Sequence, residues 1–398
     1  MSIITNWIKN LGKFDHLKLT LILSVLLFLV LEGVSSIAYY QKNRSQVQSI
    51  SSSVASIQWL LPRLRPISNN LKLTRINELR KKGIHAYPSY FHEPLLHNPK
   101  DFYYLSNLPD SYIVYCNESD HFSEWRTDEL GFRNPKGQIG SNVDFLFIGD
   151  SFTEGACVND TNTFGGVFRA KGKKVFNLGR GGSGPLFNLA TLTEYGNAVK
   201  AKTVIWFVFT GNDLQDLRKE KTSILSRYLF DDYSQGLFLK KDKVSQNLLS
   251  FLDREISLEE NRILDSKDFL HPEINYGVQM DELEAKYKEI PLLLDVASII
   301  MKKVTEGGSN LAIVIINHPR YRNVEIQDMT SALIKQFSLK HEVPFIEFSR
   351  DYLAKNWKKF YGNKGPHFNS TGYVSVGKEI FNWVESEDFK SIDISSDK

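Results

Sequence analysis

Several features that would assign a function at once are missing from this sequence. It has no zinc-type spacing of cysteine and histidine, no P-loop and no Gly-x-Gly-x-x-Gly fingerprint, and it shows no long internal repeat. Its 49 basic and 46 acidic residues leave a net charge of only +3, so composition does not indicate a nucleic-acid partner. We therefore expect no metal, no organic cofactor and no nucleic acid.

Cysteine is almost absent as well. Cys116 and Cys157 are the two cysteines of the chain. They can pair if the protein folds in an oxidising compartment, and otherwise each is a free buried thiol; two cysteines alone do not decide between these alternatives. No histidine-linked cysteine motif surrounds Cys157, so we do not interpret it as a nucleophile.

One long apolar run is present near the start of the chain. Residues 19–39 are just long enough for a membrane-spanning helix, although Glu32 interrupts their apolar character. Basic residues are slightly more frequent before the run than after it, which favours a cytoplasmic N-terminus. The small residues at 36–38 leave a cleaved signal peptide as an alternative, and a buried globular helix is another.

The predicted arrangement is therefore a single-pass membrane protein. Residues 1–18 form a short cytoplasmic stretch, 19–39 an anchor and 40–124 a stalk and membrane-proximal region, while 125–390 form a domain outside the cytoplasm, in the periplasm or at the cell surface. Within that domain, residues 214–287 are a polar insertion without clear strands. The insertion is interpreted either as a lid or as a surface excursion without a role.

Short apolar runs alternate with helical spacing throughout the predicted domain. Five runs are typical of buried parallel strands: Val143–Ile148, Lys174–Leu178, Thr203–Phe209, Leu311–Ile316 and Val343–Phe348. Four segments between or after them have helical spacing: 185–200, 291–304, 326–341 and 372–385. This alternation predicts an α/β fold with a parallel sheet covered by helices on both faces, a three-layer α/β/α sandwich.

Polar and glycine-rich stretches follow the predicted strands. The first strand ends on Gly149-Asp150-Ser151, the second runs into the glycine-rich stretch 177–184, the third ends on Gly211-Asn212-Asp213, and His367 precedes the last helix. Because parallel sheets bind ligands at the carboxyl ends of their strands, we expect these side chains to meet in one crevice.

Such a set of groups is typical of acyl-ester chemistry. Ser151 is a weak nucleophile until a base accepts its proton, and the imidazole of His367 can do so near neutral pH. The Gly182 amide, the Asn212 side chain and the Ser151 amide can stabilise the oxyanion of the tetrahedral intermediate.

These four blocks resemble those of the SGNH hydrolase family, the GDSL esterases and lipases. Gly149-Asp150-Ser151-Phe152 resembles its first block, Asn177–Gly182 its glycine block, Gly211-Asn212-Asp213 its third block, and His367 with Asn369 and Gly372 its last. Residues 130–133 (LGFR) also resemble a lead-in of membrane-anchored members linked to surface polysaccharides. The resemblance covers about residues 125–385.

The resemblance implies a flavodoxin-like sheet and the hydrolysis or transfer of acyl esters. It makes Ser151 the nucleophile, His367 the base, and Gly182 and Asn212 the oxyanion donors, with Asp150 in support. One departure is clear: the family usually has an aspartate two or three residues before its histidine, where this chain has Gly365 and Lys364.

Three interpretations of that departure remain open. A carboxylate such as Asp351 reaches His367 from elsewhere, the site works as a Ser–His dyad, or the site is degenerate. We expect a serine esterase that removes O-acyl groups, most simply acetyl groups, from a small molecule or a cell-envelope glycan. The alternatives are an O-acyltransferase with the same site and a non-catalytic glycan-binding protein.

Overall fold

The fold is described for the unit Pro66–Lys398 of the chain. Within it the computed structural model describes residues 69–89, 102–118, 121–265, 289–321, 324–362, 364–386, 389 and 392–394. The predicted anchor over 19–39 and the cytoplasmic stretch 1–18 lie outside the described residues. No helix among the described residues is long and apolar enough to cross a membrane.

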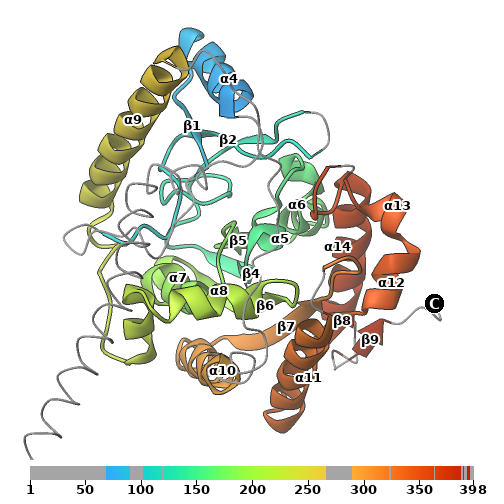
Figure 1. Cartoon of the computed structure of the whole chain (residues 1–398). Helices are drawn as coiled ribbons and strands as arrows, with labels where there is room; N and C mark the ends of the chain where they lie inside the picture. Colours follow the sequence, from blue (N-terminus) through green and yellow to red (C-terminus); the bar gives the residue numbers. More distant parts are fainter. Residues whose placement is uncertain are drawn as a thin grey trace, which may run out of the picture. The chain divides into compact units, whose positions relative to one another are not determined.

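A six-stranded sheet forms the core of this unit (Figure 1). Its strands are arranged in the order β5-β4-β6-β7-β8-β9, and every neighbouring pair is parallel. The five predicted strands are confirmed as β4 (Asn142–Ile148), β5 (Val175–Asn177), β6 (Lys200–Phe209), β7 (Asn310–Ile316) and β8 (Phe345–Phe348).

The order of these five strands is that of a flavodoxin-like sheet, with the second strand along the chain at the edge and the first beside the third. The chain therefore reverses its direction of travel across the sheet between β4 and β6, and this switch point is where such sheets bind ligands. The sixth strand, β9 (Ile392–Ile394), extends the far edge. Sequence analysis missed it because three residues carry no readable period.

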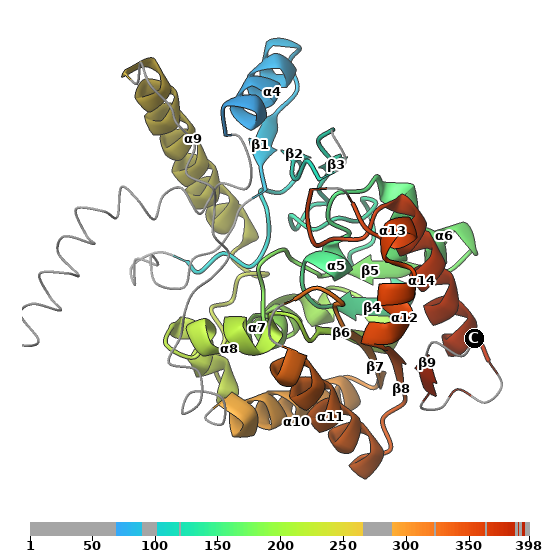
Figure 2. The same cartoon turned by 45° about the vertical axis from the view of Figure 1, so that its right-hand side comes forward.

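Helices cover both faces of the sheet, as predicted (Figures 1 and 2). Along β6 the side chains alternate: Trp206 packs in one core cluster and Phe207 in the other. The Trp206 cluster includes residues of α7 (Pro185–Tyr195), α8 (Asp213–Glu220), α10 (Glu289–Glu306) and α11 (Val324–Lys340). The Phe207 cluster includes residues of α6 (Phe164–Ala170), α12 (Arg350–Lys355), α13 (Trp357–Phe360) and α14 (Ser370–Val384).

A smaller three-stranded sheet precedes the main one. It contains β1 (Ala86–Pro88), β2 (Tyr112–Val114) and β3 (Glu124–Arg126), and helix α4 (Asn69–Lys81) packs against it. Tyr103, Tyr115 and Trp125 are buried in the same core cluster as Trp206 of the main sheet. Residues that precede position 125 therefore share the hydrophobic core of the main sheet.

The predicted insertion over 214–287 begins inside α8, whose buried leucines belong to the helical layer. It continues through a 3₁₀ turn over Ile224–Leu229 and the long helix α9 (Lys241–Asp265). Helix α9 contacts α4, where Asn77 Nδ2 donates a hydrogen bond of 2.9 Å to Glu260. In the part of the insertion that the structure describes there is no strand, in agreement with the sequence.

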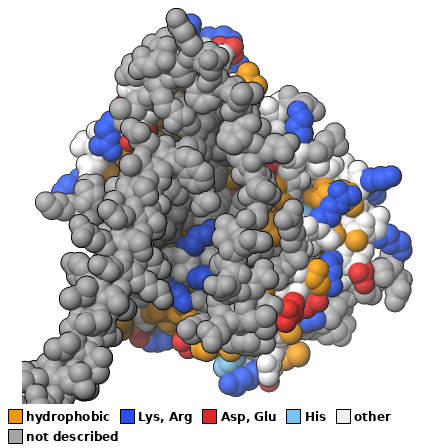
Figure 3. Space-filling model, in the orientation of Figure 1, with side chains coloured by type: hydrophobic (Ala, Val, Ile, Leu, Met, Phe, Trp, Pro, Cys, Tyr) orange, Lys and Arg blue, Asp and Glu red, His pale blue; other side chains and the backbone are white. Residues whose placement is uncertain are grey.

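The exposed residues mix charge and hydrophobicity. On the face drawn in Figure 3, basic, acidic and hydrophobic side chains of the described residues are interspersed. Of the most exposed hydrophobic residues, Phe230 and Leu239 lie in two different turns and Leu339 lies on α11. Single exposed hydrophobic side chains are normal on soluble surfaces, so they do not mark a docking site.

One buried carboxylate organises the start of the insertion. Glu194, near the end of α7, accepts hydrogen bonds from Tyr228 Oη (2.7 Å), Ser234 Oγ (2.9 Å) and the amides of Gln235 and Leu237 (2.5 and 2.7 Å). A partly buried turn is thereby held against α7 with its donors satisfied.

We predict that Glu194→Ala lowers the free energy of unfolding by about 3 kcal/mol, because two buried and two partly buried donors lose their acceptor together. Urea unfolding monitored by circular dichroism measures this difference. As a matched control, removal of the exposed carboxylate of Glu78, which forms an i,i+3 pair with Arg75, changes stability by less than about 0.5 kcal/mol. A loss as small as the control's would contradict the role assigned to Glu194.

Candidate active site

Ser151 lies at the carboxyl end of β4, as the first residue of the short helix α5 (Ser151–Glu154). Gly149 precedes it with φ of +154°, and a Cβ there would lie 2.1 Å from Thr153 Oγ1, so the turn requires glycine. Asp150 caps α5 by accepting a hydrogen bond of 2.9 Å from the Phe152 amide. The Gly-Asp-Ser ending of the strand thus makes a tight turn, caps a helix and presents a hydroxyl.

His367 reaches this hydroxyl from the other end of the chain. Its Nε2 lies 2.8 Å from Ser151 Oγ. The loop that carries His367 is fixed by Asn369, whose Oδ1 accepts from the Gly372 amide at the start of α14 and whose Nδ2 donates to the Tyr361 carbonyl, each at 3.0 Å. Two of the four sequence blocks therefore form one hydrogen-bonded pair, as predicted.

A second histidine supports the same loop. His318 follows β7 and is buried, with its Nδ1 accepting from the Arg320 amide (3.2 Å) and its Nε2 donating to the Pro366 carbonyl (3.1 Å). Burial lowers the pKa of His318 to about 4, so this ring is neutral at working pH and can keep that pattern of donor and acceptor. His318 positions the residue before His367 and does not face Ser151.

The third member of the site is Glu118. Its Oε1 lies 2.6 Å from His367 Nδ1, and its Oε2 accepts a hydrogen bond of 3.0 Å from the His367 backbone amide. Only 7% of the Glu118 side chain is exposed, so the carboxylate is almost fully buried against the histidine. Ser151, His367 and Glu118 therefore form a hydrogen-bonded chain of hydroxyl, imidazole and carboxylate.

Glu118, and not Asp351, occupies the position of the orienting carboxylate. Asp351 is an exposed residue in the first turn of α12. A Cβ added to Gly365 would lie 1.9 Å from Glu118 Cδ, so the carboxylate fills the space where a side chain at 365 would begin. Position 365 must therefore be glycine, because an acid from another segment occupies the space of its side chain. The side chain of Lys364 is exposed beside it.

The two charges of this pair compensate each other's burial. Burial would raise the pKa of Glu118, but the charge and hydrogen bonds of His367 outweigh it and lower that pKa below its usual value. Burial would lower the pKa of His367, but the charge and hydrogen bond of Glu118, with further contributions from Asp150 and Glu154, raise it. The site therefore favours the imidazolium that forms when His367 takes a proton from Ser151.

The glycine block leaves one backbone amide unused. The other amides of this stretch donate to acceptors within the protein. Gly179 donates to Asn177 Oδ1 and Arg180 to the Gly149 carbonyl. Gly181 donates to Glu154 Oε2, Ser183 to the Arg180 carbonyl, and Gly184 to Glu220 Oε1. Gly182, exposed and in the left-handed region with φ of +75°, has no acceptor within the described part of the chain. Its N–H is thus available to a ligand at the rim, next to the β4 turn to which Arg180 is bonded.

Asn212 lies across the switch point, after β6. It is the N-terminal cap residue of α8, but its side chain does not cap the helix: Nδ2 donates a hydrogen bond of 2.7 Å to Asp216. One N–H of that amide group remains for a ligand. Because β5, β4 and β6 are consecutive neighbours, the loops that carry Gly182, Ser151 and Asn212 leave the same edge of the sheet side by side.

Three buried acids lie beneath the rim. Burial raises the pKa of Asp150 to about 7 and raises that of Asp216 despite its ion pair with Lys219, while burial and the nearby charges of Asp150 and Asp216 raise the pKa of Asp213. The Oδ2 atom of Asp150 lies 3.5 Å from Ser151 Oγ, much farther than the histidine nitrogen. Asp150 thus supports α5 and adds negative potential near His367, but it does not replace Glu118.

Buried charge also fastens the surrounding loops. Arg180 forms an almost fully buried ion pair with Glu154 at the end of α5. Arg133, from the LGFR stretch, donates to Asp160, the Gly155 carbonyl and the Val158 carbonyl, at 2.6–2.7 Å. These contacts hold the segment behind Ser151 from two sides.

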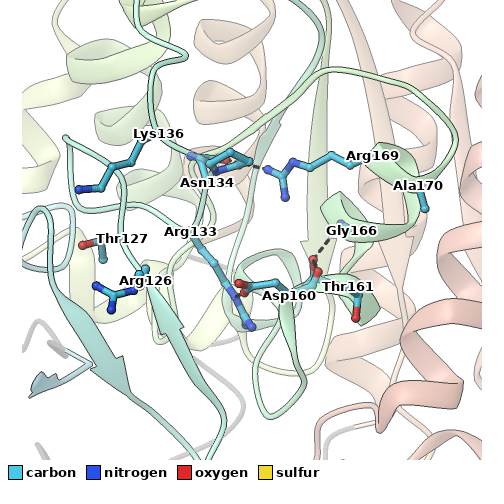
Figure 4. Close-up of a pocket in the computed structure, with 12 residues that line it drawn as sticks. Arg126, Thr127, Arg133, Asn134, Lys136, Asp160, Thr161, Gly166, Arg169 and Ala170 are labelled. Atoms are coloured by element: carbon cyan, nitrogen blue, oxygen red, sulfur yellow. Dashed lines mark hydrogen bonds and ion pairs between the residues drawn. The ribbon is translucent and has the colours of Figure 1, made fainter. Parts of the chain in front are cut away.

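A cavity of about 510 Å³ lies beside Arg133. Figure 4 shows Arg133 pointing toward Asp160 and Asn134 toward Arg169. Lys136, which also lines it, is paired with Asp110. Since neither Ser151 nor His367 lines this cavity and its basic groups already have partners, it belongs to the scaffold of the site.

The two cysteines are paired. Cys116 and Cys157 form a disulfide with a Cα–Cα distance of 5.2 Å, so the first of the two alternatives holds. The Cys157 sulfur lies 3.7 Å from His367 Nδ1. Glu118, Cys157 and His367 are close enough together to hold a metal ion, but a disulfide sulfur has no thiolate to offer one.

The comparisons with known proteins give no sequence match: no family description and no curated protein matches the chain. Solved structures give a distant likeness. A protein described as a lipolytic protein of the G-D-S-L family from Desulfitobacterium hafniense is 13% identical, over 60% of this chain and 98% of its own, with a TM-score of 0.32. An acetylxylan esterase from Geobacillus stearothermophilus is 12% identical over 63% and 98%, with a TM-score of 0.34.

A third, an alpha/beta hydrolase from the metagenome of Lake Arreo in Spain, is 11% identical over 62% and 96%, with a TM-score of 0.32. Likeness at this level does not decide fold or chemistry. The assignment of the α/β class therefore rests on the strand order and helical layers of this chain, and the chemistry on the geometry of Ser151, His367 and Glu118.

We predict that Glu118→Gln removes the charge beside His367 while it keeps a side chain of the same size in place. Without the negative charge the pKa of His367 falls, so the acid-side inflection of kcat/KM for a simple aryl ester moves to lower pH, while the plateau drops about 10²- to 10⁴-fold. Asp351→Asn is the matched control and alters neither. An inflection that stays in place in Glu118→Gln would contradict the pairing of Glu118 with His367.

Proposed function

We propose that this protein is a serine esterase that removes O-acyl groups from an extracytoplasmic substrate, most simply acetyl groups on a cell-envelope glycan. The observation that carries the proposal is the chain from Ser151 Oγ through His367 to Glu118, with heavy-atom distances of 2.8 and 2.6 Å. Both lie within the reach required for proton transfer and orientation. With Glu118 present, the missing aspartate no longer favours a degenerate site or an unassisted Ser–His dyad.

The proposed reaction proceeds in two stages. His367 Nε2 takes the proton of Ser151 as Oγ attacks the acyl carbon, and Glu118 stabilises the imidazolium. The oxyanion accepts hydrogen bonds from the amides of Ser151 and Gly182 and from Asn212 Nδ2, each worth about 3 kcal/mol in comparable sites. His367 then protonates the departing alcohol. Water, activated by the same nitrogen, releases the acyl group from Ser151.

Two further observations support the substrate and the location. Only 9% of Ser151 is exposed, which favours a short acyl chain beside the nucleophile. The Cys116–Cys157 disulfide favours an oxidising compartment, in agreement with an anchor over 19–39 and a folded unit outside the cytoplasm.

We predict that the full-length protein reacts covalently with a fluorophosphonate probe and that Ser151→Ala does not, because the activated hydroxyl is the group that displaces fluoride. In-gel fluorescence and intact mass measure the adduct. Ser298→Ala removes an exposed serine hydroxyl on α10 and retains labelling. A folded wild-type protein that takes up no probe would falsify the enzyme assignment.

Hydrolysis and transfer by the same site are distinguished by the acceptor. We predict release of acetate from an aryl acetate in water alone, and loss of this release in Ser151→Ala. Mass spectrometry of reactions with and without an oligosaccharide acceptor measures both products. Acylated oligosaccharide together with no release of acetate in water alone would replace the esterase proposal with an acyltransferase that excludes water from the acyl-enzyme.

A further inference from the structure

The orienting carboxylate comes from outside the main sheet. Glu118 follows β2 of the small sheet, and 249 residues separate it from His367. Backbone hydrogen bonds between the Tyr115 amide and the Ser123 carbonyl, and between the Ser123 amide and the Cys116 carbonyl, hold this segment as a hairpin. Both bonds are internal to the hairpin, so they shape it without joining it to the segment that carries Ser151.

The disulfide adds a covalent connection to that segment, beside the packing of Tyr115 and Trp125 in the main core. Cys116 precedes Glu118 with Asn117 between them, and Cys157 follows closely after the end of α5, which Ser151 begins. Both cysteines are buried, and the Cys157 sulfur lies 3.7 Å from the nitrogen of His367 to which Glu118 is bonded. Cys157 also adopts a left-handed backbone with φ of +64°, which non-glycine residues seldom do unless the surroundings require it.

We propose that the Cys116–Cys157 disulfide is a positioning element of the active site, which holds Glu118 against His367, so that its reduction switches off catalysis in protein that remains folded. The inference rests on the proposed function of Ser151 and His367. Reduction by an external dithiol adds two electrons and two protons: the S–S bond breaks, both cysteines become thiols, and the dithiol closes into its own disulfide.

Gly365 provides a way to test position separately from stability. A Cβ at 365 would lie 1.9 Å from Glu118 Cδ and 2.3 Å from each carboxylate oxygen. An aspartate side chain places its carboxyl carbon about 1.5 Å, and its oxygens roughly 2.4 Å, from its own Cβ, so it reaches the same space once Glu118 is shortened. The acid would then belong to the same loop as His367 and would not depend on the hairpin.

The experiment compares the oxidised and reduced full-length protein, with thiols counted and folding monitored by circular dichroism. In the wild type, and equally in Cys116→Ser, we expect loss of the disulfide to lower kcat/KM by at least about 10-fold and at most about 10⁴-fold, the loss caused by removing a triad carboxylate. In Glu118→Gln the same reduction changes kcat/KM little, because the acid is already absent. Equal losses in both proteins would show that the disulfide acts through general stability and would overturn the proposal.

The relocated acid gives a second test. Glu118→Ser combined with Gly365→Asp should be more active than Glu118→Ser alone, and its activity should be insensitive to reduction. Restored activity that is still lost on reduction would contradict the proposal, as would a wild-type protein whose kcat/KM does not change when the disulfide is reduced.

A readout independent of turnover separates this inference from the proposed function. By NMR titration, the pKa of His367 should be lower in Cys157→Ser than in the oxidised wild type as Glu118 withdraws, while the other groups that act on the ring, Asp150, Glu154 and the neutral His318, stay in place. This variant also leaves no Cys157 thiol beside His367 Nδ1, which a reduced wild type would have. If the oxidised protein has no esterase activity yet this pKa falls, the proposed function fails and the positioning role stands. An unchanged pKa overturns the positioning role whatever the activity.

Discussion

The contact between Glu118 and His367 is the interaction on which the candidate site depends. Either group buried alone would lose its charge, since burial raises the pKa of a carboxyl and lowers that of an imidazole. Together they reverse both effects, and the second carboxylate oxygen fixes the histidine backbone as well as its ring. The ring therefore has one orientation, with Nε2 toward Ser151. A ring turned away from Glu118 would leave the buried carboxylate without a partner for its charge.

The parallel sheet supplies everything else that the reaction needs at one edge. Its switch point lies between β4 and β6, so the helix that begins at Ser151 and the loop that carries Asn212 diverge there, at the place where such sheets bind ligands. The amides on either side of Gly182 are committed to internal acceptors, so they hold the turn in place and leave the Gly182 amide for a ligand. A donor held in place before the substrate arrives needs no reorganisation when the oxyanion forms.

Local signals made most of this predictable. The strands are continuous apolar runs, and Ser151, Gly182 and Asn212 lie in the turns that follow them, while His367 precedes the last helix. These four residues could therefore be chosen from the sequence. Glu118 could not, because it is one of 46 acidic residues and lies in a stretch without a period, on a hairpin that meets His367 only in the folded protein. The one sequence sign of it is negative: Gly365 leaves empty the space that the acid fills.

Because the acid comes from a separate hairpin, catalysis depends on the docking of that hairpin. An acid next to the histidine in the sequence would not impose this condition. The hairpin must dock before the charge pair can form, and the Cys116–Cys157 bond fastens that docked state to the nucleophile segment. Thiols stay reduced in a cytosol and become paired outside it. We proposed above that this unit lies outside the cytoplasm. The disulfide then makes activity depend on the compartment, because the triad is held together only where the two cysteines stay oxidised.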